Sequence, residues 1–179
     1  FDLVFATTAL VVSAPLLPLI AAAIKLDSKG PILFSQQRVG VSNDESLHLF
    51  DMLKFRTMVR NAESAQKHLR ARSDPTSPIF KMANDPRITR VGRLLRKTSL
   101  DELPQLVNVL KGDMSLVGPR PLLPSDLERF PHGVCERRFL VPPGLTGLWQ
   151  VRGRSLCSDA QRVFLDLEYV ERHSFWLDV

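Results

Sequence analysis

The most apolar part of the chain is its beginning. Residues 3–24 contain no charged side chain, and these 22 residues are enough to cross a bilayer as a helix. Pro15 and Pro18 interrupt the segment. Because a proline inside a helix removes one backbone hydrogen bond and clashes with the preceding turn, the pattern predicts a break or a sharp bend. A kinked helix that spans the bilayer and a helix–break–helix that returns to the same leaflet both satisfy it, and Ser13 could bond a carbonyl freed at the break.

The charges around this segment favour a membrane element over a cleaved signal peptide. A signal peptide needs a basic region before its apolar run, whereas the only charge before residue 3 is Asp2. Lys25, Lys29 and Arg38 follow the run. Because cytoplasmic flanks of membrane segments are enriched in Lys and Arg, the residues after the run are expected on the cytoplasmic face.

The rest of the chain alternates short strand and helix patterns. Residues 32–38 and 47–58 flank a turn-rich link and predict a β-hairpin. Residues 61–72 have the pattern of a polar helix, and residues 158–173 that of an amphipathic helix. Two rigid loops rich in proline and glycine are expected at 118–124 and 142–147. The predicted fold is a single helix-rich α+β domain with a small hairpin, preceded by the membrane element.

Two helices are predicted in the middle of the chain. The first starts near Asp85-Pro86, with proline at the first helical position, and runs to about Lys97. The second covers residues 99–111, where apolar residues follow helical spacing. Ser99 and Glu102 fit the S-x-x-E capping box, and Gly112 suits the end of this helix.

Composition narrows the function classes without choosing one. The net charge of +5 indicates an anionic partner, which could be nucleic acid, a phosphorylated ligand or a membrane surface. The two cysteines form neither a disulfide framework nor a CxxC metal pair, and the four histidines lack metal-ligand spacing. No P-loop, GxGxxG or GxSxG motif is present.

A run of basic residues precedes two adjacent acids. Arginines recur every third residue, which on a helix would form one basic stripe: Arg87, Arg90, Arg93 and Arg96. Such a stripe is often only a solvated face. Asp101-Glu102 follows in the first turn of the next predicted helix, where acids stabilise the helix by capping and by the macrodipole alone.

A different interpretation joins these groups into a phosphate site. A helix N-terminus attracts phosphate, and Lys54, Arg96 and the proline-flanked Arg120 could line a cationic pocket around the two carboxylates. Because carboxylates repel phosphate, such a site needs Mg²⁺ or several cations. One carboxylate could bind the metal while its neighbour attacks phosphorus. Adjacent residues on a helix point about 100° apart, so Asp101 and Glu102 could take different roles.

The longest match to a known pattern is DPRITRVGRLLRKTSLDELPQLVNVLKGDMSLVGPRPLLP at 85–124. It resembles the signature of the bacterial sugar transferase family, the monotopic phosphoglycosyl transferases. Supporting matches, in family order, are DSKGPILFSQQRVG, LKFRTM and PGLTGLWQVRGR at 27–40, 53–58 and 143–154. The chain most resembles members that transfer galactose or glucose phosphate to undecaprenyl phosphate, often as the C-terminal part of a larger protein.

The resemblance implies a reaction and a cofactor. In it, Asp101 attacks the β-phosphate of a UDP-sugar, releases UMP and holds a covalent phospho-sugar, which polyprenyl phosphate then attacks. Glu102 binds Mg²⁺, with Asp101 beside the metal. This would be the first membrane step in the synthesis of an exopolysaccharide, O-antigen, capsule or protein-linked glycan.

The resemblance also implies substrate-binding positions and a location. Lys54 and Arg96 match phosphate-holding positions, and Arg120 lies in the Pro-Arg-Pro motif beside the site. Gln150 and Arg154 match a late loop that faces nucleotide or sugar. The implied location is the bacterial inner membrane, with the active site on the cytoplasmic face.

The membrane element departs from the family pattern at one point. The family breaks its re-entrant helix at a Ser-Pro pair, whereas residues 13–15 here read Ser-Ala-Pro. The expected division is a membrane-embedded broken helix at 1–26 and a catalytic domain at 27–179. The absence of an initial Met and the apolar last residues indicate a piece of a longer protein, with this domain truncated at its C-terminus.

Two other functions fit parts of the pattern. A non-catalytic membrane-surface module would use the basic stripe for anionic lipid and the two acids only as caps. Nucleic-acid binding through the stripe would leave the apolar run without a role, so no nucleic-acid partner is expected. The motifs address phosphate and nucleotide, so they identify neither the sugar nor the oligomeric state, and a homo-oligomer is left open.

Overall fold

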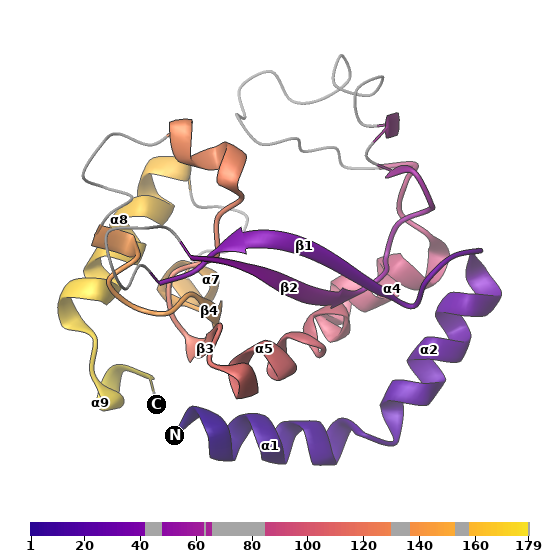
Figure 1. The fold of residues 1–179 in the computed structure, drawn as a ribbon, viewed down its shortest axis with the longest axis horizontal. Coiled ribbons are helices and arrows are strands. Elements are labelled where there is room, and N and C mark those ends of the chain that lie inside the picture. The colour runs from indigo at the N-terminus through magenta and orange to yellow at the C-terminus, as the bar shows by residue number, and fades with distance from the viewer. Residues whose placement is uncertain (42–47, 63, 66–84, 130–136, 153–157, 179) are drawn as a thin grey trace. The chain divides into compact units, whose positions relative to one another are not determined.

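The computed structural model describes residues 1–41, 48–62, 64–65, 85–129, 137–152 and 158–178 (Figure 1). It is a mixture of helices and short strands, as the α+β expectation requires. The chain forms two compact units. The first unit consists of Phe1–Val12, Ser35–Leu53 and Pro104–Val179, and the second unit of Ser13–Phe34 and Lys54–Leu103. The predicted division at residues 26 and 27 into membrane element and catalytic domain stays a prediction.

The apolar N-terminal segment is broken where its prolines predict. Helix α1 covers Asp2–Ser13 and helix α2 covers Leu16–Asp27. Pro15 occupies the N-cap of α2, and Pro18 lies in the first turn, where a missing N–H costs no helical hydrogen bond. In the described part of the chain no single helix has the length and hydropathy to cross a membrane, whereas α1 and α2 together, bent by 62°, do. The path of this pair through a bilayer stays a prediction.

The core of the second unit includes α2. Its buried side chains are Ile20 and Ile24 of α2, Phe55 of strand β2 (Leu49–Phe55) and Leu95 of helix α4 (Arg90–Thr98). Partly buried side chains pack around them, namely Leu17, Ile32, Val91, Leu100 and Leu103. Half of this buried cluster therefore comes from the apolar segment.

The predicted hairpin is present. Strands β1 (Leu33–Val39) and β2 form a two-stranded sheet (Figure 1). Hydrogen bonds from Gly40 N to His48 O and from Arg56 N to Ile32 O fix an antiparallel register. The connecting residues 42–47 lie outside the described residues, as do 63 and 66–72 of the predicted polar helix.

Helix α4 begins later than the sequence pattern suggests. Asp85 accepts hydrogen bonds from the backbone and side chain of Arg87, so this stretch forms a turn instead of the first helical turn. Thr89 is the N-cap, and its hydroxyl accepts from Gly92 N at 2.9 Å. The carboxylate of Asp27, at the end of α2, accepts from Val91 N at 2.9 Å. These two acceptors satisfy backbone donors that the helix cannot pair internally.

The expectation of one helix over 99–111 with a capping box is wrong. Ser99 has a left-handed backbone, with φ 58°, and ends α4 without a side-chain cap. A 3₁₀ turn, η2 (Leu100–Glu102), follows, and helix α5 (Gln105–Lys111) starts only after Pro104. The left-handed Ser99 ends α4, and Pro104 has no backbone N–H to donate to the preceding turn, so the chain makes a separate 3₁₀ turn before α5 begins. The predicted stop is confirmed, since Gly112 ends α5 with φ 85°.

The first unit contains a small parallel sheet and the late helices. Strand β3 (Ser115–Val117) pairs with β4 (Gly144–Thr146), so the predicted loop at 142–147 contains a strand. A 3₁₀ helix, η3 (Pro124–Arg129), lies between these strands in sequence. Helix α7 (Leu148–Arg152) follows β4. The predicted final helix is confirmed as α8 (Asp159–Arg172), with a capping box at Ser158, and a short helix, α9 (Phe175–Asp178), comes after it.

Candidate functional site

The two adjacent acids lie on the 3₁₀ turn between α4 and α5. Asp101 is 8% exposed, whereas Glu102 keeps about a fifth of its side chain exposed. The left-handed Ser99 turns the chain out of α4 and Pro104 delays the next helix, so this turn stands apart from both helices. The acids are therefore held by a turn with its own geometry, in which the side chain of Ser99 accepts no capping hydrogen bond.

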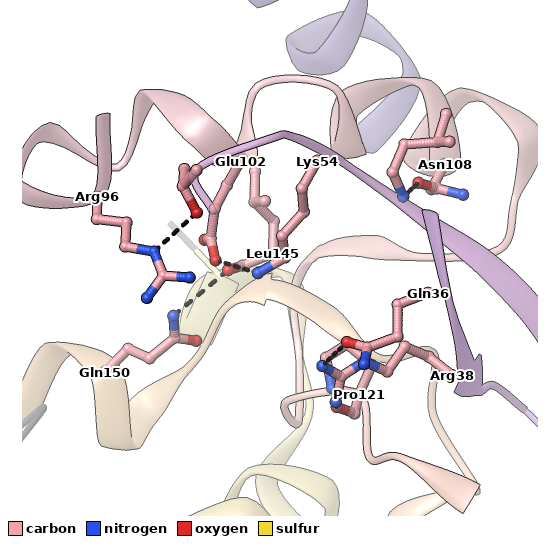
Figure 2. Close-up of polar contacts among 11 residues, drawn as sticks. Gln36, Arg38, Lys54, Arg96, Glu102, Asn108, Pro121, Leu145 and Gln150 are labelled. Atoms are coloured by element: carbon pink, nitrogen blue, oxygen red, sulfur yellow. Dashed lines mark hydrogen bonds and ion pairs between the residues drawn. The ribbon is translucent and has the colours of Figure 1, made fainter. Parts of the chain in front are cut away.

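Lys54 pairs with the second acid. Its ammonium lies 2.8 Å from Oε1 of Glu102, and both side chains are partly buried (Figure 2). Lys54 belongs to β2 and precedes its last residue, Phe55. A strand therefore carries the cation, and a turn nearly fifty residues later carries the acid that pairs with it. The structure thus brings together three residues that the motifs predict: Lys54, Asp101 and Glu102.

The electrostatic environment of Asp101 is balanced between burial and nearby charge. Burial raises the pKa of its carboxyl above the ordinary value, and the negative charge of Glu102 acts in the same direction. The positive charges of Lys54 and Arg96 lower that pKa. A partly desolvated carboxylate whose ionised form depends on two cations is more reactive than one stabilised by water.

Arg96 lies near the C-terminal end of α4, and its guanidinium is hydrogen-bonded to Thr57. Nε of Arg96 donates to Oγ1 of Thr57 at 2.8 Å, and this bond is among the dashed lines in Figure 2. Desolvation lowers the pKa of Arg96, while the charges of Asp101 and Asp85 raise it. A third predicted cation therefore shares the second unit with the two acids.

The expected basic stripe does not exist as one face. Arg87 is 6% exposed and precedes α4, and its guanidinium binds the Asp85 carboxylate at 2.7 Å. Arg90 and Arg93 are exposed. The three-residue spacing predicted a continuous stripe because it assumed that the helix began before residue 87.

The pair of acids has the donor chemistry that Mg²⁺ prefers. This ion is bound in proteins by one or two carboxylates, with water and substrate phosphates completing the shell. Among the described residues there is no group of three or more His, Cys, Asp or Glu side chains placed to hold a metal. Asp101 and Glu102 offer two carboxylates, which is the ligand type of a magnesium ion that also binds substrate phosphates.

The remaining predicted positions belong to the first unit or lie outside the described residues. The Arg120 guanidinium lies 5.8 Å from the centre of the Trp149 ring. Gln150, in α7, donates through Nε2 to the carbonyl of Leu145 at 3.5 Å (Figure 2). Arg154 falls in 153–157, outside the described residues.

The backbone of Arg120 is held on both sides by a buried ion pair. Arg138 donates to the Arg120 carbonyl at 3.1 Å, and Asp166 accepts from the Arg120 N–H. Arg138 and Asp166 themselves pair at 2.6 Å, with 4% and 3% of their side chains exposed. No pattern in the sequence indicated a role for this pair or for Thr57. Asp166 could have been suspected as an acid within an amphipathic helix, whereas nothing in the pattern marks Arg138.

Comparison with known proteins gives consistent matches. A family model described as bacterial sugar transferase matches residues 1–179. The chain is 45% identical over 184 residues to the undecaprenyl-phosphate galactose phosphotransferase of Salmonella typhimurium, covering 100% of this chain and 37% of that protein. It is 43% identical over 189 residues to the undecaprenyl-phosphate glucose phosphotransferase of Komagataeibacter xylinus, covering 100% and 33%.

A third relative shares more of its length with the chain. The UDP-glucose:undecaprenyl-phosphate glucose-1-phosphate transferase of Caulobacter vibrioides is 42% identical over 185 residues, with 99% of this chain and 64% of that protein covered. The chain spans only about a third of the Salmonella and Komagataeibacter proteins. Together the matches confirm the resemblance indicated by the motifs.

Proposed function

Because the chain belongs to the bacterial sugar transferase family, we propose that it transfers a sugar 1-phosphate from a UDP-sugar to undecaprenyl phosphate and releases UMP. The names of the Salmonella and Caulobacter relatives supply the acceptor and the class of donor. The observation that carries the proposal is the buried Asp101 beside Glu102, with the charges of Lys54 and Arg96 acting on it.

The chemistry proposed for Asp101 is nucleophilic. Its carboxylate oxygen forms a bond to the β-phosphorus of the donor, and the bond from that phosphorus to the bridging oxygen breaks. UMP leaves with the electron pair. A phosphate oxygen of undecaprenyl phosphate then attacks the same phosphorus and returns the Asp101 carboxylate. Two steps allow a soluble donor and a lipid acceptor to be used one after the other.

Lys54 and Arg96 are proposed to neutralise charge during both steps. Phosphoryl transfer depends mainly on positioning and charge stabilisation, so cations beside the nucleophile contribute more than additional reactive groups. Both lower the pKa of Asp101, which keeps it ionised for attack. Arg120, Gln150 and Arg154 are proposed as further contacts to the substrate, in agreement with their motif positions.

Glu102 and Asp101 would hold Mg²⁺, which, when bound, neutralises diphosphate charge. Removal of the ion with EDTA should abolish UMP release, and added Mg²⁺ should restore it. Activity that persists in EDTA would exclude a magnesium requirement.

The α1–α2 pair is proposed to embed in the bacterial inner membrane, with the site at the cytoplasmic face. Apolar side chains are exposed along both helices, among them Val4, Val12 and Leu19. Such surfaces are stable in lipid and costly in water. A site near headgroup depth would meet the phosphate of the acceptor.

The test is UMP release by membranes that contain the protein. With Mg²⁺ and undecaprenyl phosphate, UDP-galactose and UDP-glucose should be compared as donors. Asp101→Asn should reduce UMP release by about a thousandfold or more, since the nucleophile is lost. Asp51→Asn, the same change at an exposed position, is the matched control. UMP release by Asp101→Asn at the parental rate would refute the assignment.

A second measurement addresses the covalent step. With donor alone, the intact mass of the parental protein should rise by one sugar phosphate, and the Asp101→Asn variant should show no such rise. A single-step transfer without an aspartyl intermediate predicts no adduct in either protein.

A further inference from the structure

We propose that Thr57 is a positioning residue for Arg96, whose guanidinium it orients toward the diphosphate of the donor. The inference rests on the proposed function, and it adds a role for a neutral side chain that touches neither the acids nor Lys54 in any hydrogen bond of the described residues.

The hydrogen bond selects one edge of the guanidinium. Nε of Arg96 donates to Oγ1 of Thr57 at 2.8 Å, and Thr57 is 6% exposed. A guanidinium has five N–H donors in a planar fork, and it binds phosphate with two parallel donors. Among the described residues no hydrogen bond from Nη1 or Nη2 of Arg96 is present. With Nε engaged, the Nη1–Nη2 edge is the one presented to an anion.

The backbone of Thr57 is hydrogen-bonded to the start of α4 and packs closely against it. Its carbonyl accepts from Thr89 N at 3.1 Å, and Val59 N donates to the Arg87 carbonyl at 2.9 Å. Gly92, in the first turn of α4, lies so close that an added Cβ would be 2.1 Å from the Thr57 carbonyl oxygen. The backbone of Thr57 therefore lies against the start of α4, at Thr89 and Gly92, and the same helix carries Arg96, so both partners of the hydrogen bond belong to one packed structure.

A neutral acceptor suits a residue that must bind an anion. Had a carboxylate accepted from Nε, its charge would cancel much of the attraction for phosphate. Asp85 is near enough for its charge to raise the pKa of Arg96, but its oxygens are hydrogen-bonded to Arg87. The hydroxyl of Thr57 thus fixes direction while the positive charge of Arg96 stays available.

The experiment compares Thr57→Val and Thr57→Ser in the membrane-embedded protein, with UDP-galactose and UDP-glucose as donors. Valine keeps the shape and removes the acceptor, whereas serine keeps the hydroxyl. Thr57→Val should raise the KM for the donor about tenfold with a smaller change in kcat, as expected for lost binding through a charged hydrogen bond. Thr57→Ser should stay within about twofold of the parent.

A double-mutant cycle with Arg96→Lys separates orientation from general damage. Lysine has no Nε–H to be oriented, so Thr57→Val should add little to the loss caused by Arg96→Lys. If Thr57→Val multiplies that loss by its full factor, or if its KM equals that of Thr57→Ser, the proposal is overturned. Should the valine variant not accumulate, Thr57→Cys, with a weak acceptor, takes its place under the same criteria.

The activity of the parent protein distinguishes a wrong role for Thr57 from a wrong proposed function. If the parent releases no UMP from either donor under conditions in which it is folded and in membranes, the proposed function fails, and Thr57 with it. If the parent is active and the valine and serine variants match it, only the role of Thr57 fails.

Discussion

The buried ion pair of the first unit allows a sharp prediction about stability. Arg138→Met removes a 2.6 Å contact to Asp166 and a 3.1 Å hydrogen bond to the Arg120 carbonyl, at sites only 4% and 3% exposed. Breaking such a pair by deleting one partner costs about 3–5 kcal/mol, because the other charge is left buried. For a chain of this size each kcal/mol lowers the melting temperature by about 2–4 °C, so a fall of about 10 °C is expected.

The loss should depend on pH with a defined sign. Burial raises the pKa of Asp166 from 3.8 to about 6, and the charge of Arg138 opposes this rise. A carboxyl with a raised pKa contributes stability that is complete below 3.8 and is lost as pH rises through about 6. In the Arg138→Met variant the pKa of Asp166 is higher than in the parent, because the opposing positive charge is gone. The variant therefore continues to lose stability above about pH 6, where the stability of the parent no longer changes through this group. The difference between parent and variant should therefore grow between about pH 5 and about pH 8.

The assay is thermal unfolding, followed by tryptophan fluorescence, of all variants in the same detergent at about pH 5 and about pH 8. Arg137→Met is the matched control, because Arg137 pairs with Glu171 and both side chains are more than half exposed. Exposed pairs of this kind contribute only about 0–1 kcal/mol to stability. Combining Arg138→Met with Asp166→Leu should recover part of the loss, because both charges of the buried pair are then removed, while the backbone of Arg120 still loses two hydrogen bonds. The reasoning is refuted if Arg138→Met melts within about 2 °C of Arg137→Met at the higher pH.

Two further changes test the second unit. Gly92→Ala should lower stability by about 1–3 kcal/mol and reduce transfer with it, because the new Cβ would overlap the Thr57 carbonyl; Arg93→Ala, at the exposed next position, should change melting by less, and equal effects would contradict the close approach. Lys54→Met should move the acid limb of kcat/KM to higher pH, because a charge that lowers the pKa of Asp101 is lost and attack requires the ionised form. Lys54→Arg should leave the limb in place, and an unmoved limb in the methionine variant would contradict Asp101 as the titrating group.

Local patterns predicted the elements that depend on local chemistry. The hairpin, the final helix and the break at Pro15 follow from residues close together in sequence, and each is present. The helix expected from 99 to 111 failed because two local signals competed. Ser99 and Glu102 match a capping box, but Pro104 cannot donate a backbone hydrogen bond to the preceding turn, and Glu102 pairs with Lys54.

The candidate site was predictable only in part, because some of its contacts join residues that are far apart in sequence. Motif matches identified Asp101, Glu102, Lys54 and Arg96 as residue types in family order, and the structure groups them within the second unit. The support behind them was not predictable, since Thr57 meets Arg96 across 39 residues of sequence. Such long-range partners leave no periodic trace in a single sequence.

Helix α2 is part of the hydrophobic core of the second unit, so this unit depends on the second half of the apolar segment. Ile20 and Ile24 contribute half of a four-residue buried cluster, and Asp27 holds the start of α4. A shortened protein that starts at residue 27, made in the hope of water solubility, would expose Phe55 and Leu95 to water. Exchange of this segment between relatives would likewise have to include the matching surface of α4, so the two are expected to be inherited together.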